Sequence, residues 1–234
     1  MICKIAQLLV SVPEAGGMDL RCRAYAADEP GEPHIVLDEG RYYWEFWPGI
    51  SLEESAYLSS GQQFYLALLR HGGMMLHASA VMLHGKAYLF SGPCGTGKST
   101  HTRLWQQEFG PEARVFNDDK PALRCLDGRW YAFGTPWCGK DGINENLQVP
   151  LAGICFLRQS PENRIRRLSP EEAIPQFLSQ TVHRLSPENG LRLLSLLDGL
   201  LRQIPVYELE NRPEPAAARL SWETMRRGAE EDKE

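Results

Sequence analysis

The residues best suited to chemistry form the glycine-rich segment Gly92 to Ser99, with the sequence GPCGTGKS. It matches the Walker A pattern G-x-x-x-x-G-K-[ST] and stands between a predicted strand over 86–91 and a predicted helix over 100–109. Glycines in such a loop let backbone N–H groups turn toward phosphate oxygens, and the start of the helix adds partial positive charge. We therefore expect Lys98 to reach the β- and γ-phosphates of a bound nucleotide and the Ser99 hydroxyl to ligate Mg²⁺.

The alternative for this segment is a glycine-rich turn that caps a helix and binds nothing. Such a turn has no use for a lysine and a serine directly after the third glycine. The segment therefore predicts a phosphate-binding loop. The expected nucleotide-binding residues are Gly92, Pro93, Cys94, Gly95, Thr96, Gly97, Lys98, Ser99 and Thr100.

Two acidic residues follow a predicted buried strand over 114–117, in the run Asn117-Asp118-Asp119. Carboxylates at a strand end beside a phosphate loop either hold Mg²⁺ or take the proton of an attacking hydroxyl. The bland alternative is an Asx-type turn with solvated carboxylates, which is common for Asn-Asp runs. The phosphate loop favours the functional interpretation.

A third polar segment, Gly134 to Lys140, follows a predicted strand and combines turn formers with an aromatic residue and a cation. Two interpretations stay open. It closes over a substrate, with Lys140 as the functional member, or it is a rigid corner with Trp137 in the core.

The surrounding sequence predicts hairpins mixed with helices, hence a mixed sheet and not a regular βαβ series. Two-residue turns at His84-Gly85 and Asp127-Gly128 each join two predicted strands. Serines at 51, 169 and 186 precede acidic first turns, which is typical of helix starts. A strand over 75–83 is expected to carry His77, and the final run, 226–234, is expected to be a mobile charged tail.

Composition excludes several classes of protein. The chain has 234 residues and a net charge of -5, which argues against a general binder of nucleic acid or anionic membranes. No stretch offers the roughly 18 uninterrupted apolar residues of a membrane span. The six cysteines form no C-x-x-C pair and no zinc-type spacing, so a reducing compartment and a cytoplasmic location are expected.

The segments LHASAVMLHGKAYLFSGPCGTGKST, FNDDKPAL and GTPWCGK resemble the catalytic domain of the HPr kinase/phosphorylase family, which has a phosphoenolpyruvate-carboxykinase-like P-loop fold. That family carries a His fifteen residues before the first glycine of the loop, and His77 stands at this spacing from Gly92. The resemblance implies that Asp118 is the catalytic base, that His77 assists it, and that Lys98 and Ser99 serve phosphate and metal. It also implies ATP and Mg²⁺ as cofactors and leaves homo-oligomerisation open.

The chain departs from that family at several places. The family's Glu-x-Arg-Gly segment, whose Glu helps to bind metal, is replaced by Tyr-Ala-Phe before Gly134, and the later loop with a catalytic Arg is not found. Asp119 is therefore expected to be the second metal ligand, and Lys140 or Arg103 to supply the missing positive charge. By analogy with relatives that share the shorter GTPW-x-G-K pattern, the acceptor is expected to be a Ser of a peptide or small protein.

We thus expect an α/β fold, a mixed-sheet P-loop domain of the HPr kinase type over 59–225, with a small β-rich layer over 1–58 and the charged tail over 226–234. The expected activity is ATP- and Mg²⁺-dependent phosphoryl transfer to a hydroxyl. The main alternative is a nucleotide-binding regulatory or scaffold protein without transfer. A hydrolase or carboxykinase-like enzyme is a weaker alternative, because no set of carboxylate-binding arginines is recognisable.

Overall fold

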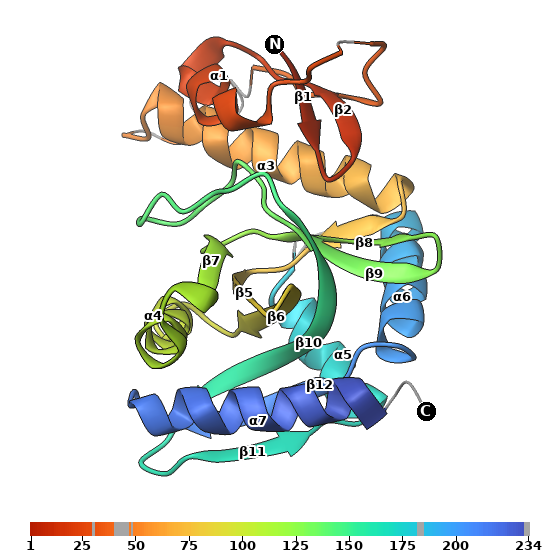
Figure 1. Ribbon diagram of the computed structural model, residues 1–234. Coiled ribbons are helices and arrows are strands. Elements are labelled where there is room, and N and C mark those ends of the chain that lie inside the picture. Colours follow the sequence, from red (N-terminus) through yellow and green to blue (C-terminus); the bar gives the residue numbers. More distant parts are fainter. Residues whose placement is uncertain (30, 40–46, 48, 182–184, 232–234) are drawn as a thin grey trace.

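The computed structural model describes residues 1–29, 31–39, 47, 49–181 and 185–231 (Figure 1). A large mixed sheet occupies its centre and confirms the predicted α/β class. The strands of this sheet are β4 (Gly73–Met75), β5 (Ala78–Leu83), β6 (Lys86–Ser91), β7 (Arg114–Asn117), β8 (Ala122–Leu126), β9 (Arg129–Phe133), β10 (Gln148–Gln159), β11 (Arg164–Arg167) and β12 (Val206–Asn211).

The sheet runs in the order β4-β8-β9-β10-β6-β5-β7, and β12 joins it by pairing with both β10 and β11. β10 pairs in parallel with β6 and with β12, while β5 pairs antiparallel with both β6 and β7. The start of β5 therefore lies beside the ends of β6 and β7. The segments that follow β6 and β7 in the sequence therefore begin close together, at this edge of the sheet.

Helices cover the sheet on both sides (Figure 1). They are α1 (Met18–Arg21), α3 (Leu52–Arg70), α4 (Lys98–Phe109), α5 (Pro170–Ser179), α6 (Pro187–Leu201) and α7 (Pro215–Glu231), with short 3-10 turns at Ala15–Gly17, Arg23–Tyr25 and Gly110–Glu112. Ser51, Ser169 and Ser186 each accept a backbone N–H at the start of α3, α5 and α6, which confirms the predicted helix starts.

Alternation along the strands divides the core in two. On β6, Tyr88 and Phe90 join one apolar cluster with Trp105 of α4, whereas Ala87 and Leu89 join the other. This is the period of two expected of a strand buried on both faces. The first cluster also contains Met225 of α7, and the second extends through α3 and α6.

A three-stranded sheet, β1 (Ile2–Ile5), β2 (Leu8–Ser11) and β3 (Ile35–Val36), forms the expected N-terminal β layer. It lies beyond α3 in Figure 1, and its buried residues belong to the same apolar cluster as those of α3. The predicted domain boundary at 58/59 falls inside α3.

Two local expectations need correction. The single strand expected over 75–83 is two strands, because the chain leaves β4 for β5 at Leu76 and His77. The tail expected to be mobile is helical as far as Glu231, and the rest of it, 232–234, lies outside the described residues. Ala218, Ser221 and Met225 bury one face of α7, which anchors the helix despite its charged end.

Both predicted two-residue hairpin turns are confirmed. His84 and Asp127 have positive φ, as do the glycines that follow them, which matches the left-handed turns that suit the twist of a hairpin. Within the described ranges, none of the helices combines the length and the apolar character that crossing a bilayer requires.

Candidate active site

The glycine-rich loop connects β6 to α4, as the sequence predicts. Gly92, Gly95 and Gly97 have φ of 147°, 84° and 97°, a region that other residues rarely adopt. A Cβ at Gly92 would lie 2.9 Å from the Thr96 hydroxyl and 3.1 Å from the carbonyl oxygen of Leu157. The backbone therefore needs glycine here both for its direction and for its close approach to β10.

Lys98 lies inside this loop. Its Nζ donates to the carbonyl oxygens of Gly92 at 2.8 Å and Pro93 at 3.2 Å. Burial lowers the pKa of Lys98, and the nearby Asp119 carboxylate acts in the opposite direction. The ammonium group is thus held in the centre of the loop, where phosphate oxygens are expected.

The acidic run follows β7 and is fixed by an Asx turn. Asn117 Oδ1 accepts the backbone N–H groups of Asp119 at 3.1 Å and Lys120 at 2.8 Å, and Asn117 Nδ2 donates to the carbonyl oxygen of Thr135 at 3.0 Å. The turn that the sequence offered as the bland alternative is therefore present. It does not leave the carboxylates solvated, because Asp118 is only 5% exposed.

Asp118 lies against the loop that contains Gly139. The Gly139 N–H donates to Asp118 Oδ1 at 2.6 Å, and a Cβ at Gly139 would lie 2.9 Å from Asp118 Oδ2. Burial raises the pKa of Asp118, an effect that the Gly139 N–H opposes and that Asp141 and Asp119 add to. A carboxylate with a raised pKa is a stronger proton acceptor than a solvated one.

Asp119, and not Asp118, is the acidic residue that contacts His77. His77 Nε2 lies 3.2 Å from Asp119 Oδ1, and Lys120 Nζ donates to Asp119 Oδ2 at 3.0 Å. In the structure His77 thus contacts Asp119, the residue that follows the base implied by the resemblance. The reason is the Asx turn, which directs successive side chains apart: Asp118 toward Gly139 and Asp119 toward the start of β5.

His77 is held between two acceptors. Its Nδ1 lies 3.1 Å from Gln180 Oε1, an orientation that is set because Gln180 Nε2 donates to the Ser179 hydroxyl. Burial, together with Lys120 and Lys98, lowers the pKa of His77 and keeps the ring neutral. A neutral imidazole has one N–H, so it can donate to only one of the two acceptor oxygens at a time. If the ring took up a second proton, both nitrogens would donate and both acceptors would be satisfied.

Strand register brings the two chemical segments together. Ser91, the last residue before the loop, pairs with Ala78, and Asn117 pairs with Ala80 on the other side of β5. Hydrogen bonds close the same corner, since Ser91 Oγ donates to the carbonyl oxygen of His77 at 2.9 Å and the Ala78 N–H donates to that of Asp119 at 2.9 Å. The loop, His77 and the acidic pair therefore share one edge of the sheet.

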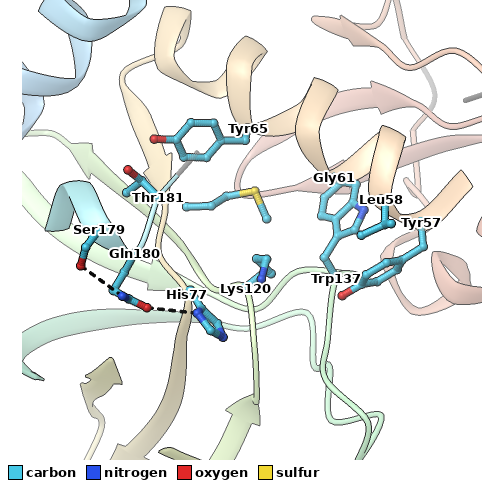
Figure 2. Close-up of a pocket in the computed structure, with 11 residues that line it drawn as sticks. Tyr57, Leu58, Gly61, Tyr65, His77, Lys120, Trp137, Ser179, Gln180 and Thr181 are labelled. Carbon is cyan, nitrogen blue, oxygen red and sulfur yellow. Dashed lines mark hydrogen bonds between the residues drawn. The ribbon is translucent and has the colours of Figure 1, made fainter. Parts of the chain in front are cut away.

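A cavity of about 250 Å³ opens beside this edge (Figure 2). Figure 2 shows His77, Lys120 and Gln180 on one side and Tyr57 with Trp137 on the other. The Tyr57 hydroxyl donates to the carbonyl oxygen of Cys138 at 2.8 Å. The cavity is lined by Tyr57, Leu58, Gly61, Tyr65, Met75, His77, Lys120, Trp137, Ser179, Gln180 and Thr181.

The structure resolves part of the open question on the Gly134–Lys140 segment. Trp137 is 1% exposed, stacks on Phe64 of α3 at 4.7 Å and donates through Nε1 to Ser60 Oγ at 3.1 Å. The rigid corner is therefore present. Lys140, at the end of this corner, is exposed.

Among the residues that the structure describes, no group of three or more His, Cys, Asp or Glu side chains comes together as a metal site. Mg²⁺ takes one or two protein ligands and completes its shell with water and substrate phosphates, so the Mg²⁺ site expected from the sequence does not require such a group. Ser99, the residue expected from the sequence to be one ligand, lies in the first turn of α4, and the carboxylate of Asp119, the other expected ligand, acts electrostatically on Lys98.

Several site residues were not expected from the sequence. Lys120 follows Asp119 directly, so its place beside the carboxylate could have been suspected from adjacency. Tyr57 comes from α3 and Gln180 from the end of α5. Nothing in their own segments marks them, because only the packing of α3 and α5 around the sheet edge brings them to His77.

No protein-family model matches the sequence, and no curated protein matches it either. Among solved structures, the Hpr(Ser) kinase/phosphatase from Coxiella burnetii is similar over 66% of this chain and 95% of that chain, with 12% sequence identity and a TM-score of 0.35. A TM-score at this level does not establish a shared fold.

Proposed function

We propose that this chain is a P-loop kinase that transfers the γ-phosphoryl group of ATP, with Mg²⁺, to a hydroxyl group, and that the acceptor is a Ser of a peptide or small protein. One observation carries the proposal: a glycine loop with a central lysine and a buried carboxylate of raised pKa meet at the same edge of the sheet. Phosphoryl transfer needs little more than positioning and charge stabilisation, and these are the groups that provide them.

The loop is the binding site for the triphosphate in this proposal. Its backbone N–H groups and the N-terminus of α4 favour negative charge. Lys98 exchanges its bonds to the Gly92 and Pro93 carbonyl oxygens for bonds to β- and γ-phosphate oxygens. Because these carbonyls hold the ammonium group at the centre of the loop, Lys98 needs only a small movement to engage the nucleotide.

Asp118 is the proton acceptor in the proposed mechanism. It is nearly buried and carries a raised pKa, and the Gly139 N–H holds one of its oxygens while the other remains available. It accepts the proton of the acceptor hydroxyl as the hydroxyl oxygen attacks phosphorus. Gly139 acts as a positioning residue, because a side chain there would meet the carboxylate.

Ser99 and Asp119 hold the metal in this proposal. Mg²⁺ held there with ATP would supply positive charge that stabilises the transferring phosphoryl group. Lys120 and His77 position the Asp119 carboxylate through contacts at 3.0 Å and 3.2 Å. His77, whose lowered pKa keeps it neutral, holds the Asp119 carboxylate on one side and Gln180 on the other.

The cavity of Figure 2 is the proposed route of the acceptor; Asp118 does not line it, and His77 and Lys120, which do, connect it to the neighbouring Asp119. Its walls are mostly apolar and aromatic, while His77, Lys120 and Gln180 supply the polar side. This lining suits a hydroxyl carried on a peptide whose neighbouring side chain is apolar. Lys140 is exposed directly after Gly139, and Arg103 pairs with Asp141 at 2.6 Å. We assign the additional charge on the transferring group to Lys140.

Two isosteric variants test the mechanism. Asp118→Asn keeps an oxygen for the Gly139 N–H but cannot take a proton, so transfer should fall about 10²- to 10⁴-fold while ATP affinity stays within about threefold. Asp119→Asn should instead weaken Mg²⁺ binding, visible as a higher Mg²⁺ concentration at half-maximal rate. If Asp118→Asn transfers phosphate at the wild-type rate, Asp118 is not the base and the proposed mechanism is wrong.

A further inference from the structure

An open groove of about 360 Å³ lies between the glycine loop and the end of β10. Loop residues 93–96 line one side of it, and strand residues 157–159 line the other. It shares no lining residue with the cavity of Figure 2, so the loop has a second approach besides the proposed route of the acceptor. A side chain of β10 that lines this groove faces the place where phosphate is expected.

Strand register places Arg158 beside the start of the loop. Phe156 of β10 pairs in parallel with Ser91, the last residue of β6. Arg158 comes two residues later on the same strand, so it lies on the same face of the sheet as Phe156 and at the level where β6 leads into the loop. Arg158 also lines the groove together with the loop residues.

Two close approaches hold this end of β10 against the loop. A Cβ at Gly92 would lie 3.1 Å from the carbonyl oxygen of Leu157. Gln159 Nε2 donates to the carbonyl oxygen of Gly95 at 2.9 Å. Arg158 stands between Leu157 and Gln159 in the sequence, so its backbone is fixed beside the loop from both sides.

The Arg158 side chain is exposed and forms no ion pair or hydrogen bond with any residue that the structure describes. Glu210, its register partner on β12, does not pair with it. Three other cations of the site are engaged, since Lys98 donates to loop carbonyl oxygens and Lys120 and Arg103 each pair with an aspartate. Arg158 therefore brings a charge to the loop that no described acidic residue neutralises.

We propose that Arg158 binds the γ-phosphoryl group of the nucleotide and makes the site select a triphosphate over a diphosphate. The inference rests on the proposed nucleotide site and adds a residue to it. A guanidinium group offers five N–H donors in a planar fork that matches phosphate oxygens. A cation at the γ-phosphoryl group also stabilises the charge on that group during transfer. Arg158 supplies this charge from the side of β10, and Lys140 from the loop beside Asp118.

The strand order explains why the terminal phosphate is the one that Arg158 meets. Backbone N–H groups of a Walker A loop cradle the inner phosphates. In the proposed mechanism the γ-phosphoryl group lies toward Asp118, which follows β7. The order β10-β6-β5-β7 places the start of the loop, after β6, between Arg158 and Asp118. The γ-phosphoryl group is therefore the part of the nucleotide that these two side chains approach from opposite sides.

Calorimetric titration with the Mg²⁺ complexes of ATP and ADP, without an acceptor, tests the assignment. We expect the wild-type protein to bind ATP about tenfold or more tightly than ADP. Arg158→Gln should weaken ATP binding about tenfold and leave ADP binding within about twofold, so that the preference for ATP disappears. Arg158→Lys keeps the charge without the planar fork and should retain part of the preference. Arg164→Gln is the matched control, because Arg164 is also exposed and also a register partner of Glu210, but lies on β11 outside the groove.

The same variants enter the transfer assay at saturating ATP. Arg158→Gln should slow transfer about 10²-fold or more, whereas Arg164→Gln should transfer at the wild-type rate. A wild-type rate for Arg158→Gln would refute a role of Arg158 in the transfer step.

The binding outcomes separate this inference from the proposed function. Equal wild-type affinities for ATP and ADP, an unchanged preference in Arg158→Gln, or equal losses for the two nucleotides in that variant each refute contact between Arg158 and the γ-phosphoryl group. If the wild-type protein binds neither nucleotide, the nucleotide site is wrong and the inference fails together with the proposed function. If the preference for ATP depends on Arg158 but no acceptor receives phosphate, the assignment of Arg158 holds and the kinase fails.

Discussion

His101 makes a quantitative prediction about stability, because burial holds its pKa near 3 in the folded chain against an ordinary value of 6.5. As the pH falls toward and below 6.5, His101 takes up a proton in the unfolded chain but stays neutral in the folded chain. The free energy of unfolding must therefore fall as the pH falls. The slope for one proton is about 1.4 kcal/mol per pH unit. Between about pH 8 and pH 4.5 this residue alone should therefore remove roughly 3 kcal/mol of unfolding free energy.

The perturbation that isolates His101 is His101→Gln, which cannot titrate and still offers polar atoms to Ser221 and Trp105. Urea unfolding of both proteins at a series of pH values from about 8 to 4.5 gives the two pH dependences. The variant is expected to be less stable at pH 8 and to lose about 3 kcal/mol less than the wild-type chain on acidification. His84→Gln, in the exposed hairpin turn, controls for removing an imidazole from the surface. Parallel curves for His101→Gln and the wild type would refute a neutral, buried His101.

Three further predictions concern the candidate active site. In Gly139→Ala the new Cβ would lie 2.9 Å from Asp118 Oδ2 and should push the carboxylate by about half an ångström. Transfer should then slow about tenfold or more, with ATP affinity unchanged. Gly190→Ala, where a Cβ meets nothing within 4 Å, is the control and should change neither transfer nor ATP affinity. Asp118→Asn should raise the melting temperature, because the raised pKa means that the charged carboxylate costs stability at neutral pH; a lower melting temperature would contradict that burial penalty. Trp137→Phe removes the bond to Ser60 Oγ but keeps the stacking on Phe64, so stability should fall by about 1–3 kcal/mol in urea titrations, and an unchanged midpoint would show that the bond contributes nothing.

The sequence predicts the local features of this fold because their causes are local. The hairpin turns follow from His84-Gly85 and Asp127-Gly128. The loop before α4 follows from three glycines, because its backbone adopts positive φ at each of them. Helix starts at Ser169 and Ser186 are equally local, since the serine side chain bonds a backbone group three residues ahead. Strand register then places the two predicted chemical segments at one edge, as expected for strands that neighbour β5.

What the sequence could not predict depends on side-chain direction and on distant packing. Which of two adjacent aspartates meets His77 is decided by the turn at Asn117, whose own partner is the carbonyl oxygen of Thr135. Trp137 belongs to the core because Phe64 and Ser60 of α3 meet it there.

The helix at the chain's end shows the same limit. Its last turns are strongly charged, which on composition alone indicates a tail. Burial of Ala218, Ser221 and Met225 against the sheet outweighs that composition and extends α7 to Glu231.

The central claim is transfer of phosphate to a hydroxyl, and the most direct test follows the phosphate itself. The purified protein is incubated with Mg²⁺ and γ-labelled ATP beside HPr, Ser-containing peptides encoded near its own gene, and free serine. We predict label on a serine hydroxyl of a peptide or small protein, and its loss in Asp118→Asn. Tight ATP binding without transfer to any acceptor in the panel would contradict the kinase and favour a nucleotide-binding regulatory protein.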